Sequence, residues 1–217
     1  MDTLTAKDIR ALFKLWKRRM AENRQWFLEL DSALGDGDLG LTMTGGFAKA
    51  SEALAPLEES SIGKLMSKAG AVIASSAPST MGTLLATGFM KGGKALQDTP
   101  EAGVAEMARF FAAFVDGMMA RGKAKPGEKT ALDSLWPAAE ALRQSAASGD
   151  SLPQALARAA AAAAEGFEKT KDMPGVHGRA AYYQEGSLGK CDPGAAVGVV
   201  LMRALAEYVA ETAEVDT

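Results

Sequence analysis

Two helical stretches of this chain are joined by the segment Leu30-Asp31-Ser32-Ala33-Leu34-Gly35-Asp36-Gly37-Asp38-Leu39-Gly40-Leu41-Thr42. Three aspartates fall within eight positions of this segment, and glycines alternate with the last two of them. Carboxylates held this close repel one another, so each pKa would rise unless a cation lay between them. Mg²⁺ takes oxygen ligands and keeps coordination positions open for water or phosphate. The segment therefore predicts a metal site at Asp31, Asp36 and Asp38, shared with a nucleotide.

A simple turn between helices is the alternative interpretation of this segment. Glycine adopts positive φ readily, and aspartate is common in turns and at helix N-caps. Two aspartates would favour that turn, but the third, with glycines at alternate positions, favours a metal site. The pattern is not an EF-hand, because no twelve-residue loop closes with Glu, and it is not a Walker A loop, because no Gly-Lys-Ser/Thr follows.

Charge and cysteine content restrict the class of protein. The net charge of -3 and the sequence pI near 5.4 argue against a protein that binds nucleic acid or an anionic membrane. One cysteine cannot form an internal disulfide, as is typical of a reducing cytosol. The N-terminus lacks the basic-then-apolar order of a signal peptide, and we expect no apolar run that approaches the ~20 residues of a membrane span. The sequence predicts a soluble cytoplasmic protein.

Apolar residues recur at helical spacing along most of the chain. Ala, Leu and Met supply most of the hydrophobic content, while aromatic residues make up only 6%, and this balance favours helices. No segment alternates with period two, so we expect no strands. No repeat or linker divides the chain, which predicts one all-α domain over residues 1–217 with about eight helices. The expected helices cover 5–30, 43–57, a stretch from 62, 83–96, 101–121, 132–145, 152–170 and a last one that starts near Val197.

Two loops are further candidates for function. Small hydroxylated residues surround Pro78 and precede a helix, so they could present N–H groups and hydroxyls to an anion. The alternative there is an ordinary Ser/Thr-capped turn. The second loop, 172–194, is the longest irregular stretch, and such loops in compact helical domains are usually functional.

Three residues of the second loop carry reactive groups. His177 is the only histidine, and with no paired acid evident it is predicted to be an exposed loop residue. Cys191 lacks an activating neighbour and is predicted to be inert. Arg179 could pair with phosphate or stack on a base, or it could form a surface ion pair; both interpretations stay open.

Three separated motifs together resemble a known family. They are Leu30-Asp31 with Gly35-Asp36-Gly37-Asp38, then Arg121 to Thr130, then Gly178-Arg179-Ala180 with Gly186 to Gly189 and Asp192-Pro193-Gly194-Ala195. Their order and spacing resemble the nucleotide-binding L subunit of dihydroxyacetone kinases. The same domain forms the C-terminal part of single-chain ATP-dependent enzymes of that group, and the resemblance covers nearly the full length.

The resemblance implies an eight-helix, antiparallel, up-and-down barrel with a nucleotide at one rim. It implies that Asp31, Asp36 and Asp38 are the catalytic residues and hold two Mg²⁺ ions against the phosphates of ADP or ATP. It also implies nucleotide contacts from three groups of residues. These are Leu39, Gly40 and Thr42 after the third aspartate, Ser76 and Ala77 in a phosphate loop, and Gly122, Ala131, Arg179, Asp192, Pro193 and Gly194 around the base and ribose.

Two departures from the family pattern stand out. The family usually has His after its third aspartate, where this chain has Leu39. Its phosphate loop usually reads Gly-Gly-Ala-Ser-Gly, whereas here Ser75-Ser76-Ala77-Pro78-Ser79 stands, and Pro78 removes one donor. The residue of 75–80 that holds the phosphates is therefore open, and a diverged branch acting on a different triose or tetrose is compatible with these changes.

The functional hypothesis is a phosphotransferase subunit for a short-chain keto-sugar. Phosphoryl transfer requires positioning and charge neutralisation rather than a protein nucleophile, and the sequence offers no good nucleophile. In the family, a separate K-type subunit holds the substrate, so this chain alone should have little activity. ATP, or ADP recharged by a phosphotransferase-system phosphocarrier, could supply the phosphate. The alternative function is a diverged, non-catalytic binding or regulatory protein on the same fold.

Overall fold

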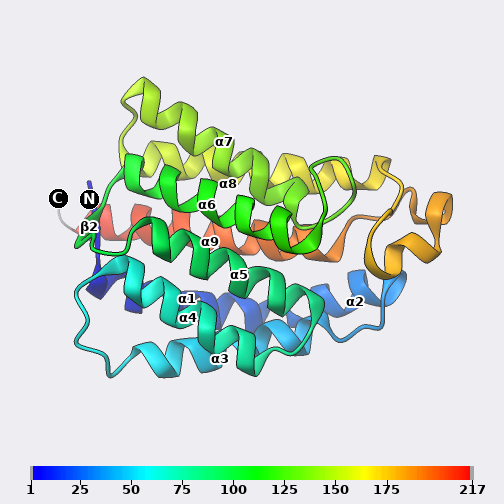
Figure 1. Cartoon of the computed structure of the whole chain (residues 1–217). Helices are drawn as coiled ribbons and strands as arrows, with labels where there is room; N and C mark the ends of the chain where they lie inside the picture. The colour runs from blue at the N-terminus through cyan, green and yellow to red at the C-terminus, as the bar shows by residue number, and fades with distance from the viewer. Residues whose placement is uncertain (1, 216–217) are drawn as a thin grey trace.

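The structure is a computed structural model that describes residues 2–215, with side chains through residue 213. Within this range the chain forms nine α-helices, three short 3-10 turns and one pair of two-residue strands (Figure 1). In chain order the elements are β1 Leu4–Thr5, α1 Ala6–Glu22, α2 Arg24–Leu34, α3 Leu39–Leu54, α4 Ile62–Ser76, α5 Thr80–Ala95, β2 Glu101–Ala102, α6 Val104–Gly122, α7 Leu132–Ser148, α8 Leu152–Lys169, η1 Thr170–Asp172, η2 Gly178–Tyr182, η3 Gln184–Ser187 and α9 Pro193–Val215.

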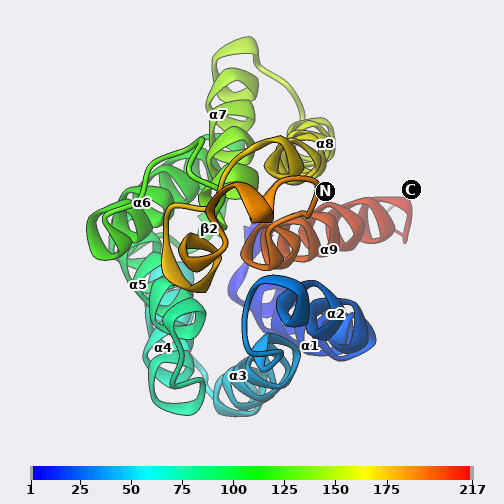
Figure 2. The same ribbon diagram turned by 90° about the vertical axis from the view of Figure 1, so that its right-hand side faces the viewer.

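Eight of these helices close into an antiparallel ring (Figure 2). Each helix from α3 to α9 packs against the next one, and α1 packs against both α3 and α9. The remaining helix, α2, follows α1 and packs against α3 and α9 beside the ring. The predicted all-α, eight-helix barrel is confirmed, and α2 is an addition that carries Asp31.

Aromatic rings fill the centre of the ring of helices. Phe89 of α5 is 1% exposed and lies between aromatic side chains of three other helices, α1, α3 and α6. The centroid of its ring lies 5.1–6.3 Å from those of Phe13, Trp16, Phe47, Phe110 and Phe114. The interior is therefore a packed core, which gives the loops at each end a rigid base.

The single helix predicted over 5–30 is wrong, because the chain breaks at Asn23. The side-chain amide of Asn23 donates to the carbonyl of Arg19 at 2.8 Å, and Asn23 leaves helical geometry with ψ of 6°. Such local side-chain bonds to the main chain compete with the helix. The capping box predicted at Thr5 and Asp8 is present at the other end of α1.

Three helices begin earlier than the apolar pattern predicts. The structure starts α3 at Leu39, α5 at Thr80 and α9 at Pro193 rather than near 43, 83 and 197. The first turn of each of these helices contains a glycine, which is a poor helix former, so periodicity alone does not reveal these starts. Ser79 shows the cause, because its hydroxyl accepts the N–H of Gly82 as an N-cap.

Two expectations about strands and apolar runs are also wrong. Leu4–Thr5 pairs antiparallel with Glu101–Ala102, although each strand has only two residues. In α9, Pro193–Ala213 has a mean hydropathy of 1.3 over 21 residues and is long enough and apolar enough to cross a membrane. Of this stretch, 61% is buried inside the structure, so packing in the ring accounts for its apolar character.

The antiparallel order places four helix N-termini at one end of the ring. These are the starts of α3, α5, α7 and α9, and the end of α2 and the turns η1 to η3 lie at the same end (Figures 1 and 2). The strand β1 and the C-terminal end of α9 lie at the opposite end (Figure 1). Every site residue predicted from the sequence belongs to a segment at the first end, although these segments are far apart in the chain.

Candidate functional site

The three aspartates of the N-terminal segment come together in the structure. Asp31, Asp36 and Asp38 each offer a carboxylate oxygen, and these oxygens lie within 4.8 Å of one another. Asp31 belongs to α2, and Asp38 is the N-cap of α3. Between them, a Cβ atom on Gly35 would overlap Oδ1 of Asp31, so the close turn requires glycine there. The donor set is all carboxylate oxygen, which suits a hard divalent cation.

Main-chain contacts fix the start of α3 against this cluster. The N–H of Leu39 donates to Oδ2 of Asp31 at 3.1 Å, whereas the Leu39 side chain is buried. Gly40 is also buried and lies against the carbonyl of Arg24. Thr42 is half-buried, and its N–H donates to the carbonyl of Asp38 as the helix begins. Leu39 thus contributes its amide, rather than its side chain, to the cluster.

Arg179 is the cation that approaches the aspartate cluster. Its guanidinium lies 2.5 Å from Oδ2 of Asp36, while 62% of the side chain stays exposed. Burial raises the pKa of Asp38, repulsion from Asp36 and Asp31 raises it further, and Arg179 opposes this rise. A cation bound between the three carboxylates would relieve this repulsion. Arg179 does form an ion pair, but its partner is one of the predicted metal ligands.

The predicted phosphate loop is a serine-capped turn in this structure. The hydroxyl of Ser76 donates to the carbonyl of Val72 at 2.6 Å, and Ala77 is buried with its main-chain N–H donated to Ile73. Among the described residues, the amides of Thr80 and Met81 in the first turn of α5 have no acceptor. The available anion donors at this position are thus first-turn amides rather than Ser76 or Ala77.

Residues at the starts of α7 and α9 form a second group. Oδ2 of Asp192 accepts the N–H of Ala195 at 2.7 Å, so this buried carboxyl caps α9. Burial raises the pKa of Asp192 to about 7, and the neighbouring Asp133 adds to the shift. Ala131 is buried against Gly194, and the half-buried Pro193 and Gly122 lie in the first turn of α9 and the last turn of α6.

A buried lysine, which the sequence reading missed, joins these segments. Lys129 is 1% exposed, and its Nζ donates to the carbonyls of Thr170 at 2.6 Å and Lys190 at 2.5 Å. Burial lowers the pKa of Lys129, and the nearby Asp192 and Asp133 oppose this shift. The sequence did not predict the burial of Lys129, because lysines in polar loops are usually solvated.

The loop around Lys129 is held by Asp133. Its two carboxylate oxygens accept the N–H groups of Gly127 at 2.5 Å and Thr130 at 2.7 Å, which fold the α6–α7 loop back onto α7. Asp133 itself is 5% exposed. An aspartate three residues after a Thr at a helix start is a signal that could have suggested this contact.

The prediction that His177 lacks a partner is wrong. Its Nε2 lies 2.6 Å from Oε2 of Glu128 in the α6–α7 loop, and the side chain is 31% exposed. A partner 49 positions away in the chain is invisible to local patterns. Burial raises the pKa of the Cys191 thiol, which fits the prediction that Cys191 is inert.

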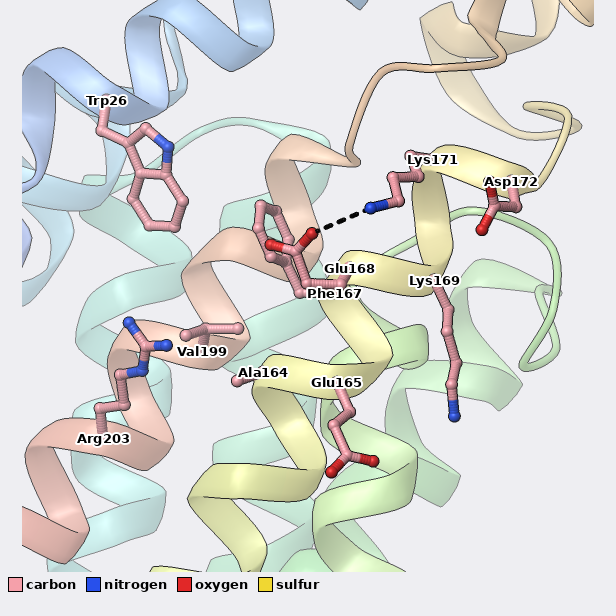
Figure 3. A pocket seen from close by; sticks show the side chains of 10 residues that line it. All are labelled: Trp26, Ala164, Glu165, Phe167, Glu168, Lys169, Lys171, Asp172, Val199 and Arg203. Atoms are coloured by element: carbon pink, nitrogen blue, oxygen red, sulfur yellow. Dashed lines mark hydrogen bonds and ion pairs between the residues drawn. The ribbon is translucent and has the colours of Figure 1, made fainter.

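A groove of about 590 Å³ lies elsewhere, between α2, α8, η1 and α9 (Figure 3). Trp26 and Arg203 flank it, and Glu168 pairs with Lys171 at 3.4 Å on another side. Its lining is Trp26, Ala164, Glu165, Phe167, Glu168, Lys169, Lys171, Asp172, Val199 and Arg203. None of the predicted site residues lines this groove, so it is separate from the aspartate cluster.

Known proteins are similar to this chain in sequence and in fold. A family model described as the DAK2 domain matches residues 33–207, which include Asp36, Asp38, Arg179 and Asp192. The chain belongs to the DAK2 domain family. The family predicted from the three motifs is thereby confirmed.

Relatives of this DAK2 domain are named as kinases or kinase subunits. The ADP-binding subunit DhaL of the PEP-dependent dihydroxyacetone kinase from Escherichia coli is 36% identical over 84% of this chain and 87% of its own length. The corresponding subunit of kinase 1 from Listeria innocua is 32% identical over 86% of this chain and 88% of its own length. L-erythrulose 1-kinase from Mycolicibacterium smegmatis is 31% identical over 94% of this chain but only 36% of its own length.

A solved structure matches the fold of this DAK2 domain. The dihydroxyacetone kinase from C. freundii, crystallised with AMP-PNP and Mg²⁺, superposes with a TM-score of 0.72 over 92% of this chain and 33% of the kinase. At 24% identity this likeness shows the fold alone.

Proposed function

We propose that this DAK2 domain is the nucleotide-binding, phosphoryl-transfer subunit of a kinase for dihydroxyacetone or another short-chain keto-sugar. The observation that carries the proposal is the aspartate cluster of Asp31, Asp36 and Asp38 with Arg179 beside it. The relatives that align over most of their own length are named as ADP-binding subunits of dihydroxyacetone kinases, which supports the same role here. The proposal treats residues 1–217 as one nucleotide-binding helical domain.

The aspartates would hold Mg²⁺, and two ions are proposed. Three carboxylates with oxygens within 4.8 Å fit Mg²⁺, since they supply hard ligands, and the nucleotide phosphates would supply the remaining negative charge for a second ion. When bound, the metal neutralises charge on the nucleotide phosphates. Asp31 is kept in position by the Leu39 amide, and Arg179 can neutralise an anion at the edge of the cluster.

The remaining contacts to ADP or ATP are proposed from segments at the same end of the ring. The starts of α3 and α5 offer main-chain amides to phosphates, because helix N-termini attract anions. The proposed nucleotide-binding residues remain Leu39, Gly40, Thr42, Ser76, Ala77, Gly122, Ala131, Arg179, Asp192, Pro193 and Gly194. The Ser76 hydroxyl and the Ala77 amide are both engaged within α4, so the phosphate contact next to these two residues would come from the first-turn amides of α5.

The keto-sugar is proposed to bind to a partner, a K-type subunit. The resemblance assigns covalent capture of the sugar carbonyl to a histidine of that subunit, and the single histidine here, His177, is paired with Glu128. The phosphate would come from ATP, or from a phosphotransferase-system phosphocarrier that recharges bound ADP. Because these donors are intracellular, a cytoplasmic location is part of the proposal.

Thermal unfolding with nucleotide and metal tests the proposal. ADP or ATP at about 100 times its dissociation constant should stabilise the chain by ~2.7 kcal/mol, but only when Mg²⁺ is present. Asp36→Asn should abolish this shift and keep the unliganded midpoint the same or higher, because it relieves repulsion. Asp98→Asn is the matched control, since the Asp98 side chain is 82% exposed and distant in the chain; it should respond as the wild type does.

The opposite result would favour the alternative function. If neither nucleotide nor Mg²⁺ moves the midpoint, and denatured protein releases no nucleotide, the chain is a non-catalytic binding or regulatory protein. With binding established, the chain alone should show little or no kinase activity toward dihydroxyacetone, and activity should appear when a K-type subunit is added.

A further inference from the structure

The segment that carries Arg179 runs from Met173 to Lys190 between η1 and α9, and we call it the Arg179 segment. It is organised by internal contacts, in which the hydroxyl of Ser187 accepts the N–H of Gly175 at 2.8 Å and donates to the carbonyl of Gln184 at 2.6 Å. Most of its side chains are exposed. The segment therefore depends on a few contacts to hold a fixed position on the ring.

Polar side-chain contacts attach this segment to the rest of the chain at its end and at η2. At its end, Nζ of Lys190 donates to the carbonyl of Ala33 at 3.2 Å, and Nζ of Lys129 donates to the carbonyl of Lys190 at 2.5 Å. At η2, the attachments within the described residues are Arg179 to Asp36 at 2.5 Å and His177 to Glu128 at 2.6 Å. His177 is the N-cap residue of η2, two positions before Arg179.

Glu128 is a well-fixed anchor for His177. Its Oε2 also accepts the N–H of Lys125 at 2.7 Å, which orients the carboxylate. The next residue, Lys129, is buried and bonded to two carbonyls, and Asp133 holds the N–H of Gly127. The loop that presents Glu128 is thus tied down on both sides.

We propose that His177 and Glu128 form a positioning pair that holds η2 so that Arg179 stands at the aspartate cluster. The inference rests on the proposed function, because Arg179 is expected to meet nucleotide phosphate there. An exposed arginine on an unanchored turn would lose its conformational freedom at the moment of binding. A turn fixed beforehand by His177 avoids that loss, which is the value of preorganisation.

Exposed ion pairs often contribute little, so the experiments measure whether the contact controls η2. In the free chain, hydrogen exchange is followed at the amides of Ala181 and Tyr183, which donate to the carbonyls of His177 and Ala180 around η2. His177→Ala should speed exchange there about fivefold, the upper end expected for such a pair. His177→Gln keeps a donor for Glu128 and should restore most of the protection. Tyr182→Ala, at an 88% exposed position of the same turn, is the control and should behave as wild type.

A double-mutant cycle then connects the pair to Arg179. His177→Ala should weaken binding of ADP with Mg²⁺ about fivefold in the wild-type background. In the Arg179→Ala background the same change should have no further effect, because His177 acts through Arg179. His177→Gln should bind nearly as tightly as wild type.

Two results would overturn the inference. One is unchanged exchange at Ala181 and Tyr183 in His177→Ala, and the other is an equal loss of affinity with and without Arg179. Absence of any ADP binding by the wild type would instead remove the proposed function, and the exchange measurement, which uses no nucleotide, would then decide the positioning pair alone.

Discussion

The ammonium group of Lys129 donates a 2.6 Å hydrogen bond to the main-chain carbonyl of Thr170. Because the same group also donates to the carbonyl of Lys190, one side chain joins the α6–α7 loop, the end of α8 and the approach to α9. The hydroxyl of Thr170 accepts the N–H of Asp192, which adds a second link between the end of α8 and the start of α9. A buried ammonium is tolerated here because carbonyl oxygens satisfy it and two carboxylates lie nearby.

Lys129→Met should strongly destabilise the chain. The change leaves two buried carbonyls without their donor and removes the positive charge near Asp192 and Asp133, so we expect a loss of about 2–4 kcal/mol in the free energy of unfolding. Urea unfolding measures it. Lys125→Met, at an exposed position of the same loop, is the control and should change stability by less than about 0.5 kcal/mol. Equal effects of the two changes would show that the hydrogen bonds of Lys129 contribute no stability.

Asp192 should make stability fall as the pH rises. Its pKa in the folded chain is about 7 against an ordinary 3.8, so between these values the folded state binds a proton that the unfolded state has lost. Stability from this group is present below pH ~4 and is lost as the pH rises through ~7. Asp192→Asn keeps an acceptor for Ala195 without the charge, so its stability relative to wild type should increase over this range, by up to about 4 kcal/mol.

Chemical unfolding of both chains at several pH values between 4 and 8 provides the comparison. Asp98→Asn corrects for the general effect of removing a carboxylate, and its difference from wild type should stay flat. A flat difference for Asp192→Asn as well would mean that Asp192 ionises as an ordinary carboxyl in the fold.

Arg179→Ala should weaken binding of ADP with Mg²⁺ by roughly tenfold, about the 1.4 kcal/mol expected for one charge-assisted contact. Arg179→Lys should restore little, since an ammonium cannot reproduce the planar, multi-donor guanidinium. Calorimetric titration gives both affinities. Arg109→Ala, at an exposed arginine of α6 paired with Glu106, should leave the affinity unchanged. If Arg179→Lys binds ADP as tightly as the wild type, only the positive charge of Arg179 matters for binding, and not the geometry of its guanidinium.

Gly92→Ala should destabilise the barrel by about 1–3 kcal/mol through overpacking. A Cβ atom at Gly92 would lie 2.7 Å from Cε2 of Phe110, in the aromatic core around Phe89. Gly45→Ala in α3 is the matched control, because its Cβ would meet nothing within 4 Å. That change should stabilise the chain by about 0.5–1 kcal/mol through helix propensity alone. Similar signs for both would contradict tight packing between α5 and α6.

Local sequence patterns predicted contacts between residues that are close in the chain, whereas contacts between distant residues became visible only in the folded ring. The Asp31, Asp36 and Asp38 cluster was predictable because one turn of eight positions brings the carboxylates together. The contacts of His177 and Lys129 bridge 49 and 41 positions, so no local periodicity can report them. Helix starts were predicted too late where a glycine lies in the first turn, as Gly40 does in α3.

The order of the helices in the ring also suggests a site for circular permutation. Because the ring has eight antiparallel helices, β1 and the C-terminal end of α9 both lie at the end of the ring that is away from the aspartates (Figure 1). The α7–α8 connection, Gly149 to Ser151, lies at that same end. A circular permutant that links the end of α9 to β1 and opens at Gly149 would leave all four connections around the aspartate end covalently intact. Biosensor inserts or affinity handles could then be placed at the new ends without approaching the nucleotide.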